Sequence, residues 1–342
     1  MRIALVSDAW LPQVNGVVRT LTTVAREAAA MGHEVRPITP DRFRTVPCPT
    51  YPEIRLALLP GRVVARLIDE ADPDHVHIAT EGPLGMAARR HCLRRGLAFT
   101  TSFHTRFPEY VAARFGVPTR VTYAWLRHFH APASGVMVAA PSIRRELATR
   151  GFANIRPWTR GVDAELFDPA LRTDFPDIPR PIFLMVSRVA VEKNIAAFLA
   201  LDLPGSKMLV GDGPQLAEMK RRFPSVHFMG RHEGRDLARH YASADVFVFP
   251  SLTDTFGLVL LEALASGLPV AAFPVTGPMD VLGDAPVGHL DTDLRRAALA
   301  CLAISREACR AHALQFSWRA TAQQFLGNLV PTRARGSYAL AS

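Results

Sequence analysis

The stretch from residue 247 to residue 270 constrains the fold of this chain more than any other. It begins with an apolar strand, passes through a short loop that carries Asp254, and continues into a helix that carries Glu262. A Gly-Leu-Pro sequence then ends the helix and leads into a second apolar strand. A strand, a helix and a strand in this order form a parallel pair, and such pairs assemble into open α/β sheets. Ligands of these sheets bind at the carboxyl ends of the strands.

The helix in this stretch begins where a phosphate group could bind. The N–H groups of a first helical turn have no acceptor inside the helix, and they attract anions. Here these groups belong to Phe256, Gly257, Leu258 and Val259. Gly257 lets a ligand approach the backbone closely, and the ionised carboxylate of Glu262 can accept hydrogen bonds from a ribose diol. The stretch therefore predicts a nucleotide-sugar site, although an ordinary strand-loop-helix unit with solvated acids has the same pattern.

The same alternation of apolar strands and helices occurs in both halves of the 342 residues. In the first half, strands are predicted at residues 3–7, 34–39, 75–78, 98–102 and 135–139, with a helix over 17–31. In the second half, strands are predicted at residues 182–187, 207–210, 226–229, 246–250 and 270–273, and residues 293–329 read as helical with a break near 316–318. Apolar strands between helices are typical of parallel sheets that are covered on both faces. The sequence therefore predicts an α/β protein of two Rossmann-like, doubly wound domains.

The chain is basic, with a formal net charge of +9, and its charge is uneven. Residues 1–175 carry 23 Arg and 16 acidic residues, whereas residues 176–342 carry 17 Lys and Arg and 15 acidic residues. A basic first half favours an anionic partner, such as phosphate, nucleic acid or a lipid surface. Because Arg outnumbers Lys 37 to 3, a biased genome composition explains the total equally well.

The spacing of the cysteines and the length of the apolar runs indicate the cellular compartment in which we expect the protein. The four cysteines fall in no metal-binding or redox spacing, which favours free thiols in a reducing cytoplasm. No apolar run has the length of a transmembrane helix. Residues 1–6 are predicted to form a buried strand and are too short for the apolar part of a signal peptide. We therefore expect a cytoplasmic protein.

The spacing of Asp254 and Glu262 resembles the paired-acid signature of retaining glycosyltransferases of family four, which have the two-domain GT-B architecture. The first acid of that signature is usually Glu, and its family role is to hold a hydroxyl of the donor sugar. Asp254 is one methylene shorter, so its carboxylate would lie further from that sugar. The resemblance extends from residue 1 to about residue 330.

The resemblance implies two domains that face a crevice. We expect an acceptor-side N-terminal domain over residues 1–172, a proline-spaced linker over 173–181, and a donor-nucleotide domain over 182–315. Residues 316–330 look similar to the GT-B helix that crosses back onto the first domain. Residues 331–342 read as a polar tail, which chain ends often form.

Three residues outside the opening stretch are candidates for catalysis together with Asp254. Arg188 and Lys193 lie on one loop after a strand, and two cations there can neutralise a leaving diphosphate, as the family's Arg and Lys at this spacing do. His104 follows another strand end and matches a family His that lies beside the transferred sugar. A lone His at a strand end is also common as a capped core residue.

Five further residues are candidates for donor binding. Asn15 and Gly16 open the first helix, where the family's loop contacts the donor diphosphate, although a plain N-cap turn has the same sequence. Gly211 and Gly213 form a tight turn after a strand, and the backbone at Arg231 would meet the base. These signals do not distinguish uracil from guanine.

The absence of two sequence motifs narrows the range of cofactors that we expect. No G-x-G-x-x-G follows the first strand and no Asp-x-Asp pair stands at a strand end, so we expect neither a nicotinamide cofactor nor a metal. The leaving group would then be stabilised by Arg188, Lys193 and helix N–H groups. The resemblance implies retention of anomeric configuration, and it is nearest to the lipid-glycosylating subset, including phosphatidylinositol mannosyltransferases and glycosyl-diacylglycerol synthases.

The expected function is transfer of a hexose from a donor of the GDP-mannose or UDP-glucose type to a hydroxyl acceptor. A diacylglycerol or phosphoinositide at the inner face of the cell membrane would suit the arginines and aromatic residues of segments 86–96 and 110–130. These segments equally suit helices with one buried face. Alternatives are a nucleotide-sugar 2-epimerase of the same architecture and a non-enzymatic peripheral membrane protein. Nucleic acid is not an expected partner because the chain has no recognised binding motif.

Overall fold

The computed structural model describes residues 1–13, 15–48 and 51–333, with the side chains of 51–53 and 113–115 left out, and it separates into two compact units. Unit 1 contains Met1–Thr159 together with the chain from Trp318 onward, and unit 2 contains Arg160–Ser317. The predicted linker, residues 173–181, lies inside unit 2 in this division. Most of the predicted tail, residues 334–342, lies outside the described residues.

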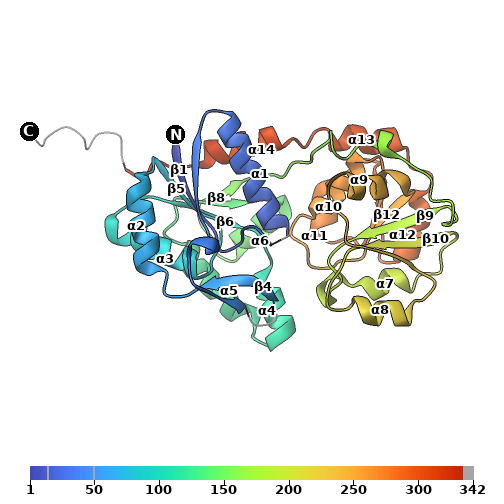
Figure 1. The fold of residues 1–342 in the computed structure, drawn as a ribbon, viewed down its shortest axis with the longest axis horizontal. Coiled ribbons are helices and arrows are strands. Elements are labelled where there is room, and N and C mark those ends of the chain that lie inside the picture. The colour runs from blue at the N-terminus through green and yellow to red at the C-terminus, as the bar shows by residue number, and fades with distance from the viewer. Residues whose placement is uncertain (14, 49–50, 334–342) are drawn as a thin grey trace, which may run out of the picture. The chain divides into compact units, whose positions relative to one another are not determined.

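Unit 1 is built on a parallel sheet of six strands in the order β2-β1-β5-β6-β7-β8 (Figure 1). Its strands are β1 (Arg2–Val6), β2 (Glu34–Ile38), β5 (His75–Ile78), β6 (Thr100–Phe103), β7 (Gly135–Val138) and β8 (Ile155–Pro157). The three central strands β5, β6 and β7 are buried along their whole length, as expected for strands covered on both faces. An antiparallel hairpin of β3 (Thr45–Cys48) and β4 (Tyr51–Ala57) lies outside this sheet.

The helices of unit 1 pack in pairs against one another and against the sheet. They are α1 (Gly16–Ala30), α2 (Gly61–Ala71), α3 (Pro83–Arg95), α4 (Phe107–Phe115), α5 (Thr119–His130), α6 (Pro141–Thr149) and α14 (Trp318–Asn328), with a short 3-10 turn η1 (Pro40–Arg42). Helix α2 packs against α3, and α4 packs against α5. Asp8 caps the start of α3, because its carboxylate accepts from the N–H of Leu84 at 2.9 Å and of Gly85 at 3.3 Å. Burial raises the pKa of the Asp8 carboxyl.

Helix α14 belongs to unit 1 although it follows all of unit 2 in the sequence. It packs against α1, and the indole N–H of Trp158 donates to Thr321 O at 3.2 Å. At its end, Asn328 Nδ2 donates to Pro157 O at 2.7 Å and Arg156 Nη1 donates to Asn328 O at 2.8 Å. The prediction that the last helix returns to the first domain is therefore confirmed.

Unit 2 contains a second parallel sheet of six strands, in the order β11-β10-β9-β12-β13-β14. Its strands are β9 (Ile182–Val186), β10 (Ser206–Val210), β11 (His227–Gly230), β12 (Val246–Phe249), β13 (Val270–Ala272) and β14 (Gly288–Leu290). All of β9 and β12 is buried, in keeping with their apolar sequences. A large aliphatic or aromatic side chain buried in this way contributes about 1.5–3 kcal/mol, and Phe183, Phe198 and Leu209 lie together in the core.

The helices of unit 2 are α7 (Ile195–Leu199), α8 (Leu216–Arg222), α9 (Gly234–Ser243), α10 (Leu258–Ala265), α11 (Thr276–Leu282), α12 (Leu294–Cys301) and α13 (Arg306–Ala313), with 3-10 turns η2 (Pro169–Leu171) and η3 (Val191–Lys193). Two arginine side chains of α13 donate to backbone carbonyls at the C-terminal ends of other helices. Arg306 donates to Ala242 O and Ala244 O near the end of α9, and Arg310 donates to Ala265 O at the end of α10. Cations at helix C-termini satisfy carbonyls that lack intrahelical donors.

The predicted α/β fold with two parallel sheets is confirmed. The strands that the sequence did not reveal are the outer strands β8 and β14 and the hairpin. The first two have three residues each and mix apolar with polar or glycine residues, so they lack the buried apolar run that marks a central strand.

Candidate active site

Most of the predicted donor-side residues lie on four loops at one edge of the unit 2 sheet. These loops follow the carboxyl ends of β9, β10, β11 and β12, which are four neighbouring parallel strands. They carry Arg188 and Lys193, Gly211 and Gly213, Arg231, and Asp254, respectively. Parallel strands bring their carboxyl ends together, so residues far apart in the sequence meet at this edge.

The loops after β9 and β10 are in direct backbone contact. Val189 N donates to Asp212 O at 2.8 Å. On its other side the β10 loop meets the end of β11, where Gly211 N donates to Gly230 O at 2.8 Å. Gly211 has φ +147°, and a Cβ there would lie 1.9 Å from Ser187 O. A Cβ at Gly213 would lie 2.5 Å from Val189 O. Both glycines are therefore required for the close approach of these two loops, in addition to any contact with a nucleotide.

Lys193 and Asp254 form an ion pair that the sequence did not predict. The Nζ of Lys193 lies 2.6 Å from Oδ1 of Asp254, and the two side chains are 22% and 16% exposed. The second carboxylate oxygen, Asp254 Oδ2, is buried and has no hydrogen-bond partner among the described residues. An acceptor that is buried without a donor costs roughly 1–3 kcal/mol, so this oxygen is suited to a hydroxyl group brought by a ligand.

Further hydrogen bonds hold the Lys193 loop against the Asp254 loop. Asn194 Nδ2 donates to Pro250 O at 3.0 Å, and Ser251 Oγ donates to Glu192 O at 3.4 Å. Asn194 adopts φ +51°, which turns the chain from η3 into α7. The pair of Lys193 and Asp254 is thus supported by backbone contacts on both loops.

Helix α10 begins at Leu258 after Gly257, whose φ of +82° places it in the left-handed region. Glu262 lies one turn further and is buried, with 4% of its surface exposed. Its Oε2 accepts from the hydroxyl of Tyr241 at 3.0 Å. Tyr241 comes from α9, and no spacing in the sequence indicated it as a partner of the acid.

The remaining donor-side candidates are more exposed. Arg231 is 57% exposed and its guanidinium pairs with Glu233, with Nε 3.0 Å from Oε1. Arg188 is half-buried on the loop after β9, where Ser187 Oγ donates to Arg188 O at 3.0 Å. Phe256 is buried, whereas Leu258 and Val259 are half-buried at the start of α10.

In unit 1, Asn15 is the N-cap of α1. Its Oδ1 accepts from the N–H groups of Val17 and Val18, each at 3.0 Å, and Gly16 is the exposed first residue of the helix. The N-cap interpretation of this sequence is therefore confirmed, and the contact with a donor diphosphate stays a prediction. Val14, in the same loop, lies outside the described residues.

His104 lies at the carboxyl end of β6, half-buried. Its Nε2 is 2.9 Å from Ser102 Oγ, and its ring contacts Trp158 edge to face at 5.5 Å between centroids. Ser102 is buried and also contacts Nε2 of the buried His77 at 3.1 Å. The sequence pointed to His104 and gave no signal for His77, because a His inside an apolar strand usually reads as core.

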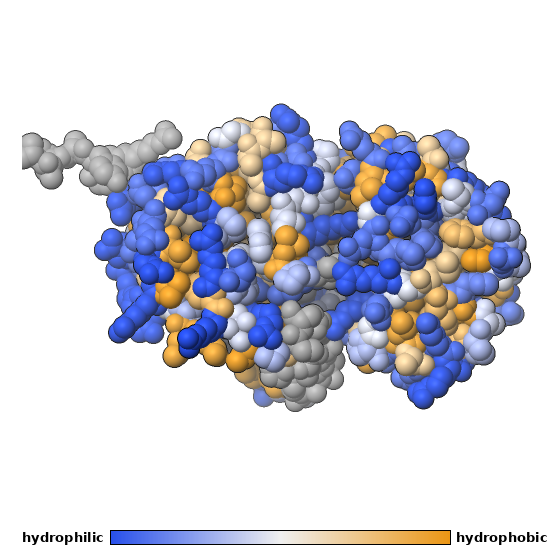
Figure 2. All heavy atoms as spheres, viewed as in Figure 1, coloured by the Kyte–Doolittle hydropathy of each residue, from blue (hydrophilic) through white to orange (hydrophobic). Residues whose placement is uncertain are grey.

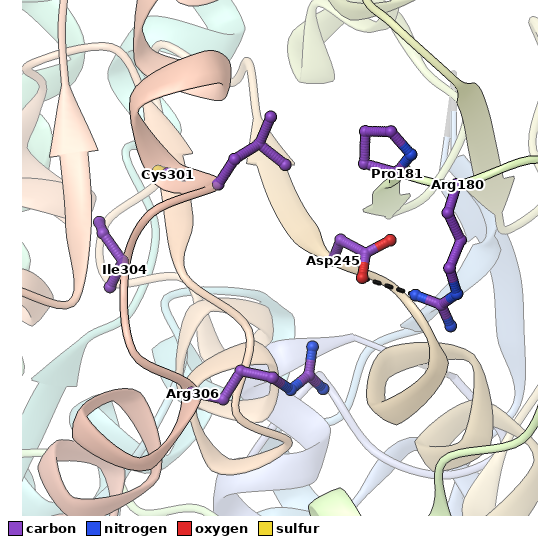
Figure 3. Close-up of a pocket in the computed structure, with 7 residues that line it drawn as sticks. Arg180, Pro181, Asp245, Cys301, Ile304 and Arg306 are labelled. Carbon is purple, nitrogen blue, oxygen red and sulfur yellow. Dashed lines mark hydrogen bonds and ion pairs between the residues drawn. The ribbon is translucent and has the colours of Figure 1, made fainter.

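A pocket of about 330 Å³ lies in unit 2, but at the other edge of the sheet (Figure 3). Pro181 and Asp245, which line it, directly precede β9 and β12. Its charged groups already have partners: Arg180 Nη1 lies 2.5 Å from Asp245 Oδ1, and Arg306 donates to backbone carbonyls. Burial lowers the pKa of Arg306. This pocket is therefore explained by the fold and is separate from the predicted site.

Within the described ranges, no group of three or more His, Cys, Asp or Glu residues could hold a metal ion. The described part of the chain also has no helix with both the length and the apolar content to cross a membrane.

Two domain models match the chain in sequence. Residues 14–166 match the one described as Glycosyltransferase Family 4, and residues 180–304 match Glycosyl transferases group 1.

Among its relatives, the chain is 32% identical to a GDP-mannose-dependent alpha-mannosyltransferase of Mycobacterium tuberculosis (strain CDC 1551 / Oshkosh), with 98% of each chain covered. It is 26% identical to the alpha-monoglucosyldiacylglycerol synthase of Streptococcus pneumoniae (strain ATCC BAA-255 / R6), over 80% of this chain and 71% of the other. Among solved structures, Anabaena HepE in complex with UDP and glucose has a similar fold, with a TM-score of 0.69 at 17% identity over 96% of this chain and 98% of that chain.

Proposed function

The chain belongs to glycosyltransferase family 4, and we propose that it moves a hexose from a GDP-mannose or UDP-glucose type donor to a lipid hydroxyl, with retention of configuration. The relatives named for a mannosyltransferase and for a glucosyldiacylglycerol synthase support the two halves of this proposal. The structural observation that carries it is the Lys193–Asp254 pair at the carboxyl edge of the unit 2 sheet.

The pair supplies two functions that sugar transfer needs. An ammonium group has three N–H donors, so the bond to Asp254 and a contact with a leaving diphosphate can coexist at Lys193. Arg188, on the same loop, adds a second cation for the charge that develops on the diphosphate. The buried, unpartnered Asp254 Oδ2 is suited to a hydroxyl of the donor sugar.

The other donor contacts follow from the start of α10. Its first two N–H groups, of Leu258 and Val259, have no intrahelical acceptors and suit the phosphates. The carboxylate of Glu262 is held by Tyr241, and in the proposed complex it accepts from the ribose diol. In unit 1, His104 would contact the transferred sugar or the acceptor hydroxyl. No step in this scheme requires a metal.

Calorimetric titration of the purified protein with GDP and with UDP tests the donor site. We expect one nucleotide to bind, with the same affinity in magnesium and in EDTA, because the proposed diphosphate contacts come from Arg188, Lys193 and helix N–H groups. The variant Glu262→Ala should weaken that binding without changing the nucleotide preferred. Binding that depends on magnesium, or no binding of either nucleotide, would contradict the proposal.

The lipid acceptor is supported by the surface of α3, α4 and α5 in unit 1. Helix α3 exposes Met86 and Leu93 beside Arg90 and Arg94. These three later residues follow Met86 by seven, four and eight positions, respectively, so all four side chains share one face of the helix. Figure 2 shows apolar side chains set among strongly polar ones over the α2–α3 side of unit 1. Trp125 of α5 is 39% exposed and contacts Phe107 of α4. Basic and apolar residues on the same face suit anionic lipid surfaces.

The double variant R90E/R94E tests this surface by vesicle sedimentation with phosphatidylglycerol-containing liposomes. Each basic residue near an anionic surface contributes about 1 kcal/mol, so the variant should lose vesicle affinity by roughly tenfold or more. The matched control is R221E/R222E, which reverses two exposed arginines of α8 in unit 2 and should bind vesicles as the native chain does. Equal binding by both double variants and the native chain would remove α3 from the lipid-binding surface.

A further inference from the structure

A chain of hydrogen-bonded polar groups connects His104 to the interior of unit 1. Thr100 Oγ1 is 2.9 Å from Nδ1 of His77, and Nε2 of His77 is 3.1 Å from Ser102 Oγ. Ser102 Oγ in turn is 2.9 Å from Nε2 of His104 and 3.3 Å from the carbonyl oxygen of Ala79. The chain thus runs from the interior of the unit 1 sheet to the end of β6.

The protonation of His77 follows from its burial. Its side chain is inaccessible to solvent, and desolvation lowers the pKa of His77 to about 3. The ring is therefore neutral at physiological pH, with one nitrogen that donates and one that accepts. Thr100 Oγ1 also lies 3.5 Å from the carbonyl oxygen of Val76, so its hydroxyl can donate either to that carbonyl or to Nδ1 of His77.

The proton of the Ser102 hydroxyl is fixed by the carbonyl of Ala79. A carbonyl oxygen can only accept, so the contact with Ala79 requires the hydroxyl to donate to it. With its only proton committed in this way, Ser102 Oγ can only accept from Nε2 of His104, which lies 2.9 Å away. His104 consequently carries its proton on Nε2 when it is neutral, which leaves Nδ1 as the nitrogen with the lone pair.

Aromatic contacts hold both rings in place. Trp158 is fully buried and contacts the His104 ring at 5.5 Å and the His77 ring at 6.0 Å, both edge to face. Phe325 of α14 contacts His77 at 5.0 Å and Trp158 at 5.2 Å. Such contacts restrict rotation of the imidazole rings, so the hydrogen-bond pattern corresponds to one arrangement.

We propose that Ser102, supported by His77, is a positioning residue that holds His104 as the Nε2–H tautomer and presents Nδ1 as a hydrogen-bond acceptor. This inference rests on the proposed function, in which His104 meets a hydroxyl of the donor sugar or of the lipid. An acceptor nitrogen matches a hydroxyl that donates, and it would not bind a carbonyl or phosphate oxygen while the ring is neutral. The Ser102 hydroxyl thereby selects the kind of group that His104 contacts.

The tautomer can be measured in the wild-type protein without any substrate. In a ¹⁵N-histidine NMR spectrum above the pKa of the ring, with the His104 signals assigned by their loss in His104→Gln, we expect the proton on Nε2. A neutral His104 ring that carries its proton on Nδ1 overturns the inference. Because this readout needs no transfer activity, it is independent of whether the proposed function is correct.

Kinetics of two Ser102 variants test the positioning role. Ser102→Ala should lower kcat by about 10- to 100-fold, the scale of a misplaced catalytic contact, while the donor nucleotide binds with unchanged affinity. Ser102→Thr keeps the hydroxyl and should restore most of kcat. Ser266→Ala is the matched control, because Ser266 is equally buried in unit 2 and its hydroxyl has no partner among the described residues.

The outcomes separate the two proposals. An unchanged kcat in Ser102→Ala, or an equal loss in the Ala and Thr variants, overturns the positioning role while the proposed function stands. A wild-type protein that binds neither GDP nor UDP contradicts the proposed function, whatever the tautomer of His104.

Discussion

Lys193→Met is expected to lower the rate of sugar transfer by at least about a hundredfold, the scale of losing one preorganised charge-stabilising donor, or roughly 2.7 kcal/mol. The side chain of methionine has a similar length and apolar stem, so the change removes mainly the charge. Two effects act together in this variant. The leaving diphosphate loses a cation, and the partly buried Asp254 carboxylate loses the ammonium that lies 2.6 Å from it.

Lysine is rare in this chain, and that supplies a matched control. Only three lysines occur in the sequence, and Lys220 is exposed on α8. Lys220→Met should transfer sugar at the native rate. Lys193→Arg should recover part of the activity, because it restores the charge but not the compact geometry of the ammonium. Steady-state rates with a radiolabelled nucleotide sugar measure all three, and a native rate in Lys193→Met would refute the assignment of the leaving-group site.

Gly211→Ala is expected to destabilise unit 2 by roughly 3 kcal/mol or more, since backbone strain and a steric clash occur together. A Cβ at this position would lie 1.9 Å from the carbonyl oxygen of Ser187, which is backbone and cannot rotate away. The loop after β9 would have to move, and this loop carries Arg188 and Lys193. Donor affinity should therefore fall together with the midpoint of thermal unfolding.

Substitution of Gly234 is the control that introduces backbone strain without a steric clash. Gly234 also has a positive φ, +54°, but no atom lies within 4 Å of a Cβ placed there. Gly234→Ala should cost only the strain of the left-handed conformation, about 1–2 kcal/mol. Differential scanning calorimetry with and without the nucleotide compares the two variants. Equal unfolding midpoints for both would mean that the loops after β9 and β10 can separate without cost.

The fold could be predicted from the sequence because apolar strands, of which β9 and β12 are the clearest, alternate with helices in both halves. The five strands predicted in each half are the four interior strands and one edge strand of each sheet, β2 or β11, and the structure contains all of them. The short strands β8 and β14 could not be predicted, because they are defined by pairing with a neighbour and their own sequences carry little pattern. Residues 293–329 were predicted as helical with one break near residues 316–318. The structure has three helices there, α12, α13 and α14, and the break between α12 and α13 was not predicted.

The loops of the candidate site could also be predicted, because polar and glycine residues directly after apolar strands must lie at one edge of a parallel sheet. What the sequence did not provide is which side chains meet there. The pair of Lys193 and Asp254 joins residues 61 positions apart, and Tyr241 approaches Glu262 from a different helix. Such pairings depend on helix rotation and loop packing, which leave no periodic signal in the chain.

The place of α14 in unit 1 has a consequence for synthesis on the ribosome. The residues around His104 are translated early, yet Phe325 and Thr321, which cover Trp158 and His77, are translated last. Unit 2 is contiguous and can fold as soon as it emerges, whereas unit 1 must wait with an incomplete core until α14 leaves the exit tunnel. A premature stop codon just before residue 318 would consequently leave unit 2 complete but remove α14 from unit 1, although most of unit 1 is encoded first.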